Sequence, residues 1–406
     1  MKSIVILGGG ASGMAAALAA RESLDNTVTL LERQSRVGRK LLATGNGRCN
    51  LTNRRTAHER YHGSDPAFAL PALSRFGVED TLAWFSSLGL VTRTEDTGRV
   101  YPLSDAAGSV ADSLRLAMDA RGVRIQCGIT AASAVRRDGR FIITFDTSGS
   151  LACDRLVVAC GGMAGAKLGG VKDGYELLGS FGHRRTALLP SLVQLKTEST
   201  WTRSMKGVRA QAVVTLERGE SVLAQTRGEV QFAEYGVTGP AIFDISRAAS
   251  AAGTGCCIIL RLLPELSEVN IIDYLHQKQN DYPNYLSENL LTGCLHNAIS
   301  RTLLRRAGIA FDAHLWSLTE SDLDRIAQLI LRFELPLQGP MGFAAAQVTA
   351  GGIETSGFDP NTMESRLVPG LFACGEVLDI DGDCGGFNLQ WAWSSGRLAG
   401  RSAAEL

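Results

Sequence analysis

The feature that most constrains this chain is a glycine cluster between a short apolar run and an alanine-rich stretch near its N-terminus. The apolar run, residues 3–7, is typical of a buried parallel strand; residues 13–21 favour a helix, and residues 27–31 favour a second strand followed by Glu32. A strand, a helix and a strand within about thirty residues predict a βαβ unit. Its two strands are expected to be parallel, with a right-handed crossover.

The cluster fits the pattern GxGxxG through Gly8, Gly10 and Gly13. In that pattern the first glycine permits a tight turn, the second lets a pyrophosphate approach the backbone, and the third allows close packing of helix and strand. The helix that follows offers free N–H groups and the positive end of its dipole to phosphates. Glu32 stands where a carboxylate accepts ribose hydroxyls, although the adjacent Arg33 is a cation of the kind that NADP sites use. The pattern predicts a nucleotide site; a plain strand-to-helix turn is the alternative.

A second element stands near the C-terminal end. Residues 369–374 form an apolar strand closed by Gly375 and Glu376, and residues 385–390 then open the last helix. In two-part FAD sites such a strand returns beside the first strand, its glycine passes the pyrophosphate, and its acid reaches a ribityl hydroxyl. The N-terminus of the last helix suits the pyrimidine end of a flavin, which carries negative charge when reduced. The two ends together predict FAD, and the alternative for this end is an ordinary last βα unit.

The middle of the chain differs from both ends. Residues 191–263 contain alternating β-type runs with a hairpin signal at 218–219, and residues 267–333 have a helical pattern. We therefore expect a nucleotide-binding domain interrupted by an inserted β-plus-α segment. The expected boundaries are 1–190 and 341–406 for the discontinuous FAD-binding domain, 191–265 for the inserted β domain, and 266–340 for the inserted helical domain.

The composition of the chain limits the classes of partner that we expect it to bind. Lys plus Arg and Asp plus Glu both number 41, so no dominant basic surface and no DNA partner are expected, although a local patch for RNA stays open. The nine cysteines contain no CxxC pair, which favours reduced thiols in a cytoplasmic protein over disulfides or a metal site. We expect no signal peptide, because the chain enters its first strand at once, and no membrane partner, because no apolar run would span a bilayer. The oligomeric state stays open.

Five further strings are specific enough to suggest a family: 38–53, 236–241, 348–353, 362–366 and 385–393. With them, essentially the whole chain resembles the BaiN/RdsA-like (YhiN-like) flavoproteins, FAD-dependent oxidoreductases of the glutathione-reductase-like superfamily. The resemblance implies an α/β fold in which a Rossmann-like FAD-binding domain, with a βαβ unit and a parallel sheet, is interrupted by a β-barrel-like and a helical segment. One departure is Cys160, where the family stretch similar to Ala-Thr-Gly-Gly has a threonine hydroxyl near the expected cofactor.

The motifs and the resemblance together assign a set of residues to FAD. For the cations of the loop 38–53, a solvated loop face is an equal alternative. No second complete fingerprint is present, so NAD(P)H is expected only as a transient reductant, at a site that the sequence does not identify. The expected FAD-binding residues are Gly8, Gly10, Ala11, Ser12, Gly13, Glu32, Arg33, Arg39, Lys40, Asn46, Gly161, Gly375, Glu376, Gly386, Phe387, Asn388 and Leu389.

The resemblance implies reduction of a carbon–carbon double bond conjugated to a carbonyl. The substrate would be uracil in ribosomal RNA, giving dihydrouracil, or a small enone such as an unsaturated 3-oxo steroid or bile acid. A non-catalytic flavin-binding redox sensor is a third hypothesis. The zero net charge speaks mildly against RNA. The helical cluster Arg301, Arg305 and Arg306 would suit phosphates, with a solvated face as its alternative.

Cys49 is the candidate catalytic proton donor. It lies in the Gly- and Asn-rich loop beside Arg48 and near Lys40, cations that would lower a thiol pKa. The alternative is a small apolar side chain that only packs. We expect the loop 38–53 and the turn 384–390 to face the flavin from its two sides, with Cys49 near the isoalloxazine or the pyrophosphate.

Overall fold

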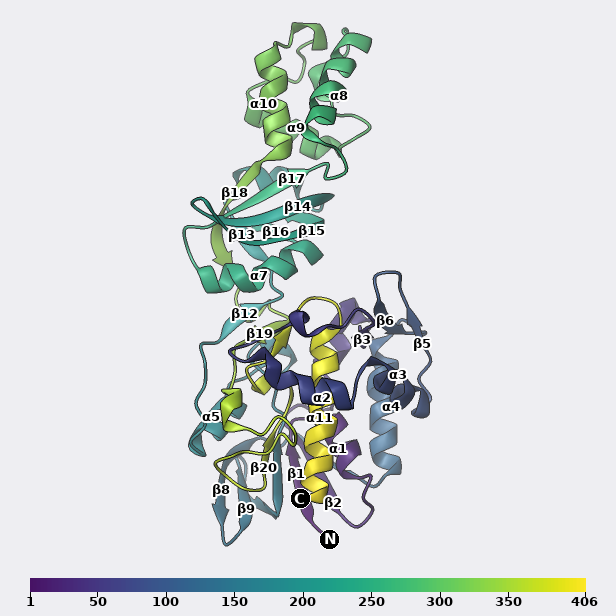
Figure 1. Ribbon diagram of the computed structural model, residues 1–406, viewed down its shortest axis with the longest axis vertical. Coiled ribbons are helices and arrows are strands. Elements are labelled where there is room, and N and C mark those ends of the chain that lie inside the picture. The colour runs from purple at the N-terminus through teal and green to yellow at the C-terminus, as the bar shows by residue number, and fades with distance from the viewer. The chain divides into compact units, whose positions relative to one another are not determined.

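The computed structural model describes residues 1–406, which divide into two compact units (Figure 1). The first unit consists of Met1–Leu189 together with Ala346–Leu406, and the second consists of Pro190–Ala345. The strands β12 (Leu189–Ser191) and β19 (Val348–Ala350) stand where the chain leaves the first unit and returns to it. Each unit has its own hydrophobic core.

The first unit is built on a five-stranded parallel sheet in the order β20-β11-β1-β2-β7. Leu7 of β1 lies opposite Leu31 on one side and Val158 on the other. Because both faces of the sheet are covered, its central strands are nearly continuous apolar runs. The expected βαβ unit and the return of the C-terminal strand to the same sheet are confirmed. The strands are β1 (Ser3–Leu7), β2 (Thr27–Glu32), β7 (Arg124–Cys127), β11 (Arg155–Val158) and β20 (Leu371–Ala373).

Helices α1 (Ala11–Ala20) and α11 (Phe387–Glu405) pack closely against one another in the first unit (Figure 1). A Cβ added at Gly396 would lie 2.4 Å from the Ser12 carbonyl oxygen, and one at Gly400 would lie 2.1 Å from the Ala16 oxygen. Because residue 396 lies beside residue 12 and residue 400 beside residue 16, the two helices run parallel. Along their common direction, the first residue of α11 lies about eight residues ahead of the first residue of α1, which is ~12 Å at 1.5 Å per residue. The start of α11 therefore extends past the carboxyl edge of the sheet, where open α/β sheets bind ligands.

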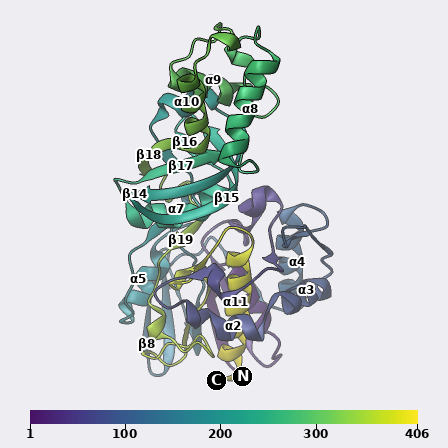
Figure 2. The ribbon, with the colours of Figure 1, turned by 45° about the horizontal axis from the view of Figure 1, so that its top comes forward.

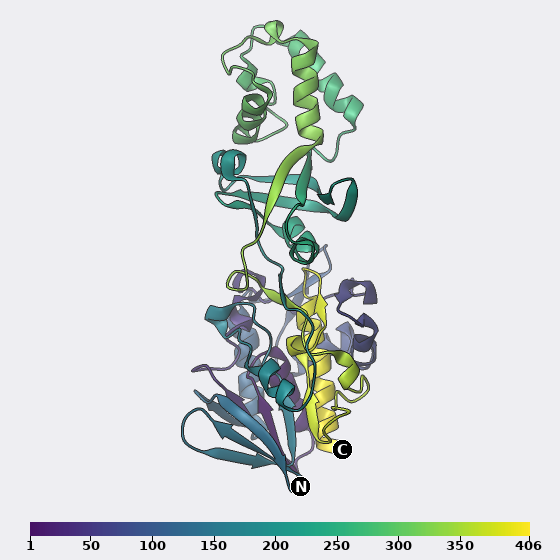
Figure 3. The same cartoon turned by 90° about the vertical axis from the view of Figure 1, so that its left-hand side faces the viewer.

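Smaller elements surround this frame. A three-stranded antiparallel sheet of β8, β9 and β10 lies at the lower left of Figure 3. A second three-stranded sheet, in the order β3-β6-β5, carries the end of the loop 38–53. The bounds are α2 (Leu70–Arg75), α3 (Val78–Ser87), α4 (Ala107–Ala120), α5 (Asp173–Ser180), β3 (Thr52–Asn53), β4 (Tyr61–His62), β5 (Thr92–Thr94), β6 (Arg99–Pro102), β8 (Ala131–Arg137), β9 (Arg140–Phe145), β10 (Ser150–Cys153) and β21 (Asp381–Gly382).

The second unit combines a closed antiparallel barrel with a group of helices (Figure 2). The barrel order is β13-β16-β15-β14-β17-β18, and barrel and helices share one core. The expected hairpin is confirmed between β14 and β15, and the Rossmann-like fold with a β-barrel-like and helical segment is confirmed as a whole. The bounds are β13 (Leu195–Thr197), α6 (Ser199–Thr202), β14 (Arg209–Arg218), β15 (Ser221–Ala233), β16 (Gly236–Thr238), α7 (Pro240–Ala252), β17 (Cys257–Leu262), α8 (Glu268–Asp281), α9 (Asn297–Ala307), α10 (Glu320–Leu331) and β18 (Phe333–Pro340).

One expected boundary needs correction. Residues 333–340, assigned to the helical domain 266–340, form β18 of the barrel, pairing with β17 on one side and β13 on the other. The physical reason is closure, because without β18 those two strands would leave open edges. The helices are thus an excursion between two barrel strands. No helix in the structure is both long enough and apolar enough to cross a membrane.

Candidate functional site

The turn between β1 and α1 shows why each glycine of the fingerprint is present. Gly8 has a φ of +107°, and a Cβ there would lie 2.4 Å from the Ala159 oxygen. A Cβ at Gly13 would lie 1.8 Å from the Gly8 oxygen, so helix and strand touch at this point. Gly10 differs, because no atom lies within 4 Å of the position its Cβ would take. The turn is therefore closed on the protein side and open at Gly10, directly before the first turn of α1.

Glu32 ends β2 beside this turn. One carboxylate oxygen accepts the Gly9 N–H at 2.7 Å and the other accepts the Gln34 N–H at 2.7 Å. The neighbouring cations have other partners: Arg33 forms an ion pair with Asp173 at 3.1 Å, and Arg39 donates to the Gln34 side chain at 2.6 Å. The Glu32 carboxylate is thus held in place by backbone donors and has no cation of its own.

Glu376 is the point at which several distant segments meet. Its Oε2 lies 2.6 Å from the Lys40 Nζ, and its Oε1 accepts the Thr349 N–H at 3.0 Å. A Cβ added at Gly162 would lie 2.6 Å from the same Oε1. The loop 38–53, the loop after β11, the segment 348–353 and the C-terminal Gly-Glu pair therefore converge on one carboxylate.

Gly375 joins the C-terminal segment to the start of α1. Its φ is +76°, and a Cβ there would lie 2.4 Å from the Ser12 Oγ. Its N–H donates to Ser395 at 3.0 Å, and its carbonyl accepts the Trp391 indole N–H at 3.1 Å. Helix α11 thus fixes the end of β20 against α1, and the two motifs that predicted FAD lie in direct contact.

The turn before α11 contacts the loop 38–53 directly. Asn53 donates to the Gly385 carbonyl at 2.9 Å, and the Thr52 hydroxyl donates to the Gln390 side chain at 2.6 Å. A Cβ at Gly386 would lie 2.7 Å from the Thr52 backbone, so only glycine fits this approach. The two segments, which we expect on two sides of a flavin, are therefore in direct contact at this end.

The other expected residues at the start of α11 have structural partners. The Asn388 amide donates to the Gly382 carbonyl at 2.7 Å and accepts the Gly382 N–H at 2.8 Å. The Phe387 ring is buried and meets Tyr61 edge to face at 6.3 Å, while Leu389 is half-buried. Asn388 therefore fixes the preceding turn with its side chain.

The remaining expected residues differ in exposure. Ser12 is buried and Ala11 half-buried in the first turn of α1. Gly161 has a φ of +71° with no atom within 4 Å of its Cβ position, so it is a second open glycine. Asn46 has a φ of +56° and is exposed.

Asn50 was not among the expected residues. Its side chain is 8% exposed, and its Oδ1 has no hydrogen-bond partner. That oxygen lies 2.9 Å from the Cβ position of Gly386, at the N-terminus of α11. An unpaired buried acceptor costs about 1–3 kcal/mol, so it marks a place where a ligand donor would be stabilising. The only available signal was its position in the string 38–53.

Cys49 departs from its expected chemistry. Its side chain is fully buried, and burial raises the pKa of the thiol to about 12. The expected lowering of the thiol pKa is wrong because the nearby cations have other partners. Arg48 lies over the Tyr101 ring at 4.0 Å and pairs with Glu95 at 3.1 Å. Lys40 pairs with Glu376. The geometry favours the alternative in which Cys49 packs.

The three arginines of α9 all have partners within the protein. Arg301 pairs with Glu288 at 2.5 Å, and Arg306 lies over the Phe333 ring at 4.7 Å while donating to the Glu334 carbonyl. Arg305 lies over the Phe311 ring. No group of three or more His, Cys, Asp and Glu side chains is arranged to hold a metal ion.

Comparisons with known proteins extend over the whole chain. The family described as HI0933-like protein Rossmann domain matches residues 2–402. A 3-dehydro-bile acid delta(4,6)-reductase of Clostridium scindens is 38% identical over 409 residues, covering 100% of both chains. A ribosomal RNA dihydrouridine synthase of Escherichia coli is 30% identical over 396 residues, covering 96% of this chain and 95% of that one. Among solved structures, a 3-ketosteroid delta1-dehydrogenase of Sterolibacterium denitrificans aligns with 12% identity and a TM-score of 0.49, covering 100% and 99% of the two chains.

Proposed function

Since the chain belongs to the HI0933-like Rossmann family, we propose that it is an FAD-dependent oxidoreductase that reduces a carbon–carbon double bond conjugated to a carbonyl group. The observation that carries the proposal is the meeting of the two FAD motifs. Gly375 lies against Ser12, and Glu376 pairs with Lys40. A fingerprint used only as a structural turn would not need the open side at Gly10 or the second motif beside it.

The residues present fit FAD on three independent observations. Gly10 leaves its backbone accessible at the start of α1, where N–H groups suit a pyrophosphate. Glu32 holds a carboxylate beside that turn, in position for ribose hydroxyls. The N-terminus of α11 lies ~12 Å from that of α1 along the helix direction, at 1.5 Å per residue. The unpaired Asn50 Oδ1 lies beside this N-terminus. Beyond these three, Glu376 directly follows Gly375, which lies against Ser12 in the first turn of α1, and would accept a ribityl hydroxyl.

The chain's own contribution is positioning and electrostatics. FAD, when bound, supplies the reducing equivalents as a hydride, and NAD(P)H is the proposed transient reductant. The positive end of the α11 dipole would stabilise negative charge at the pyrimidine end of a bound flavin. Lys40 and Thr349 orient the Glu376 carboxylate, so it needs no rearrangement to receive the ribityl chain. Cys49 stays protonated at neutral pH, and it would donate a proton only if the loop 38–53 exposed it.

A small enone, such as an unsaturated 3-oxo steroid or bile acid, is the substrate class we favour. The Clostridium scindens relative, named for a bile-acid reduction, shares 38% identity over the full length. Of the α9 arginines that would suit RNA phosphates, Arg301 is neutralised by Glu288, while Arg305 and Arg306 lie over aromatic rings. The second candidate is uracil in ribosomal RNA, which the 30% identity to the Escherichia coli dihydrouridine synthase supports.

One experiment separates these candidates. The purified holoenzyme is reduced with dithionite without oxygen and mixed in a stopped-flow instrument with an unsaturated 3-oxo bile acid or with ribosomal RNA lacking dihydrouridine. Rapid flavin reoxidation by the bile acid, with formation of the saturated product, is expected. Reoxidation by RNA alone would select the second candidate, and mapping dihydrouridine in cells with and without the gene would then identify the site. A reduced flavin that neither substrate reoxidises would favour the redox sensor.

A further inference from the structure

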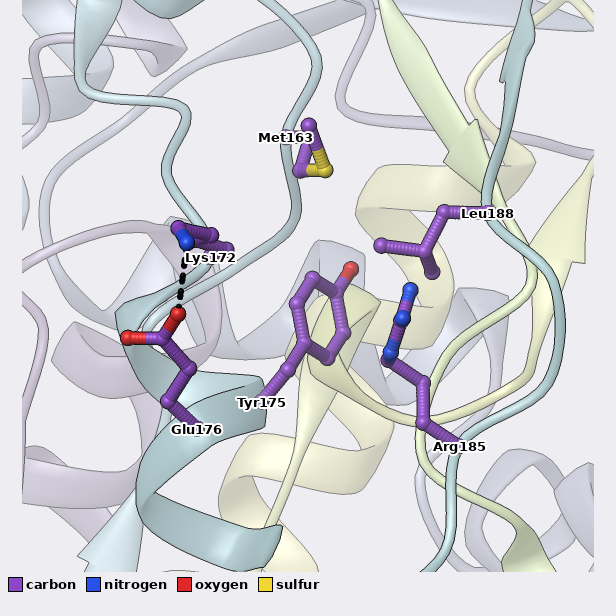
Figure 4. A pocket seen from close by; sticks show the side chains of 6 residues that line it. All are labelled: Met163, Lys172, Tyr175, Glu176, Arg185 and Leu188. Carbon is purple, nitrogen blue, oxygen red and sulfur yellow. Dashed lines mark ion pairs between the residues drawn. The ribbon is translucent and has the colours of Figure 1, made fainter.

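The first unit contains a pocket beside α5 in which none of the proposed FAD residues takes part. Its volume is about 250 Å³, room for roughly eight water molecules at ~30 Å³ each. Met163 and Leu188 give it apolar walls, and charged side chains stand at its sides (Figure 4). The lining residues are Met163, Lys172, Tyr175, Glu176, Arg185 and Leu188.

Tyr175 places an unsatisfied donor in this pocket. The residue is 4% exposed, and its hydroxyl has no hydrogen-bond partner. The Thr349 hydroxyl, which accepts the Ala164 N–H at 2.9 Å, is the polar side chain that acts on the Tyr175 hydroxyl from within the protein. Figure 4 shows the Tyr175 hydroxyl directed toward the space between Met163 and Leu188. Burial, followed by the negative charge of Glu376, raises the pKa of Tyr175, so the hydroxyl remains a donor at neutral pH.

The charges around the pocket leave one cation without an acidic partner. Lys172 and Glu176 form an ion pair at 2.7 Å and neutralise each other. Arg185 forms no ion pair, and its guanidinium lies over the Tyr175 ring at 5.9 Å. The adjacent Arg184, by contrast, pairs with Glu354 at 3.2 Å. Among the lining side chains, the positive charge of Arg185 is therefore the one left without an acidic partner, and it stands beside a phenol donor and two apolar walls.

We infer that this pocket is a second ligand site, which binds a small organic anion. The ligand has a body of about one ring between Met163 and Leu188 and a carboxylate or phosphate that accepts from Arg185. The Tyr175 hydroxyl supplies the second donor. Charge-assisted hydrogen bonds of a planar guanidinium suit such oxyanions, and the apolar walls suit a ring. Anion binding at this pocket goes beyond the proposed reaction and does not depend on it, and only the reduced dinucleotide as its source rests on the proposed function.

Two sources share this chemistry. One is the nicotinamide mononucleotide half of a reduced dinucleotide, since Met163 directly follows Gly162, which approaches Glu376. The other is a small carboxylic acid, as a substrate fragment or an effector. Nicotinamide mononucleotide and benzoate are therefore the two probes, and their relative affinities distinguish the sources.

The test measures binding directly on the full-length, FAD-loaded protein by calorimetry and ligand-observed NMR. At least one probe should bind saturably. Arg185→Gln should weaken it about 10-fold or more, as expected for a lost charge-assisted hydrogen bond, and Arg185→Lys should weaken it less. Tyr175→Phe should weaken it several-fold by removing only the hydroxyl. Arg184→Gln, the matched control, should bind like the wild type, and melting curves should show that every variant is folded.

Three results would overturn the inference. Saturable binding of neither probe would show that the pocket is not a site. Equal loss in Arg184→Gln and Arg185→Gln would show that the probe responds only to general surface charge. Competition between a probe and FAD, measured on protein stripped of cofactor, would place the pocket within the cofactor site itself.

Discussion

Lys40 and Glu376 form an ion pair with 2.6 Å between Nζ and Oε2, although 336 positions separate them in the chain. Both side chains are partly exposed, at 29% and 20%, so water screens the attraction and the pair adds little to folding stability. Its main effect is geometric, because it holds the loop 38–53 against the C-terminal Gly-Glu segment. The pair therefore belongs to the cofactor site more than to the core.

The first prediction concerns this carboxylate. Glu376→Gln should raise the dissociation constant of FAD about 10- to 100-fold, the effect of losing one charge-assisted hydrogen bond. The melting temperature of the cofactor-free protein should change little. Equilibrium dialysis and differential scanning fluorimetry measure the two quantities. Glu354→Gln is the matched control, because it breaks the Arg184 ion pair away from the proposed cofactor residues; a similar loss of FAD in that variant would contradict the assignment.

The second prediction concerns Glu32 and the identity of the cofactor. Heat should release FAD, not FMN, from the purified protein, because Glu32 and the glycine turn serve an adenosine half that FMN lacks. Glu32→Ala should lose FAD on dialysis. It should also lower the stability of the cofactor-free protein by about 1–3 kcal/mol, since the Gly9 and Gln34 N–H groups lose their acceptor. Mass analysis showing FMN, or full FAD occupancy in the variant, would refute the ribose role.

How far the sequence predicts the structure depends on how local each signal is. The turn of Gly8, Gly10 and Gly13 was predictable because strand, turn and helix are adjacent in the chain. The capping box of Thr319 and Asp322 at α10 is a signal of the same local kind, because its two residues are three positions apart. β18 was missed because Pro336, Pro340 and Gly339 are residues that normally argue against a strand.

The chemistry of the loop 38–53 was less predictable than its place. The cations beside Cys49 suggested a lowered pKa only as long as their partners were unknown. Arg48 pairs with Glu95, 47 residues away, and Lys40 pairs with Glu376. Burial of the thiol likewise depends on tertiary packing that no local pattern contains. The unpaired Asn50 oxygen is visible only once Gly386 is placed beside it.

The third prediction tests the contact between α1 and α11. Gly400→Ala would put a Cβ 2.1 Å from the Ala16 carbonyl, so the helices must separate and the protein should lose roughly 2 kcal/mol or more of stability. Gly108→Ala in α4 is the matched control, because no atom lies within 4 Å of its Cβ position. That change should be neutral or stabilising by up to about 1 kcal/mol, through helix propensity and reduced entropy of the unfolded chain. Urea unfolding of both variants provides the comparison, and equal effects would count against the close contact.

The fourth prediction concerns alkaline pH. Burial raises the pKa values of four thiols of the first unit to about 12, against an ordinary value of 9.0: Cys49, Cys153, Cys160 and Cys374. Between pH 9 and about 12 the unfolded chain releases these protons while the folded chain retains them, so stability falls as the pH rises. The slope is at most about 1.4 kcal/mol per pH unit for each thiol. Urea midpoints at pH 8, 9 and 10 should decrease, and less steeply when all four cysteines are alanine; parallel slopes would exclude the thiols as the cause.

The fifth prediction separates the two roles of Cys49. Cys49 is fully buried with a pKa of about 12, so its role should be packing. The Cys49→Ser variant should therefore bind FAD, its flavin should be reducible, and hydride should pass to the enone at an unaltered rate. Rapid mixing of pre-reduced enzyme with substrate isolates that step. If Cys49 were the general acid, the same variant would slow it by ~10²–10⁴-fold. Iodoacetamide labelling of the wild type gives an independent measure, because the exposed Cys127 should react well before Cys49. Fast labelling of Cys49 in the native protein would show that the loop 38–53 opens, and would return the thiol to the mechanism.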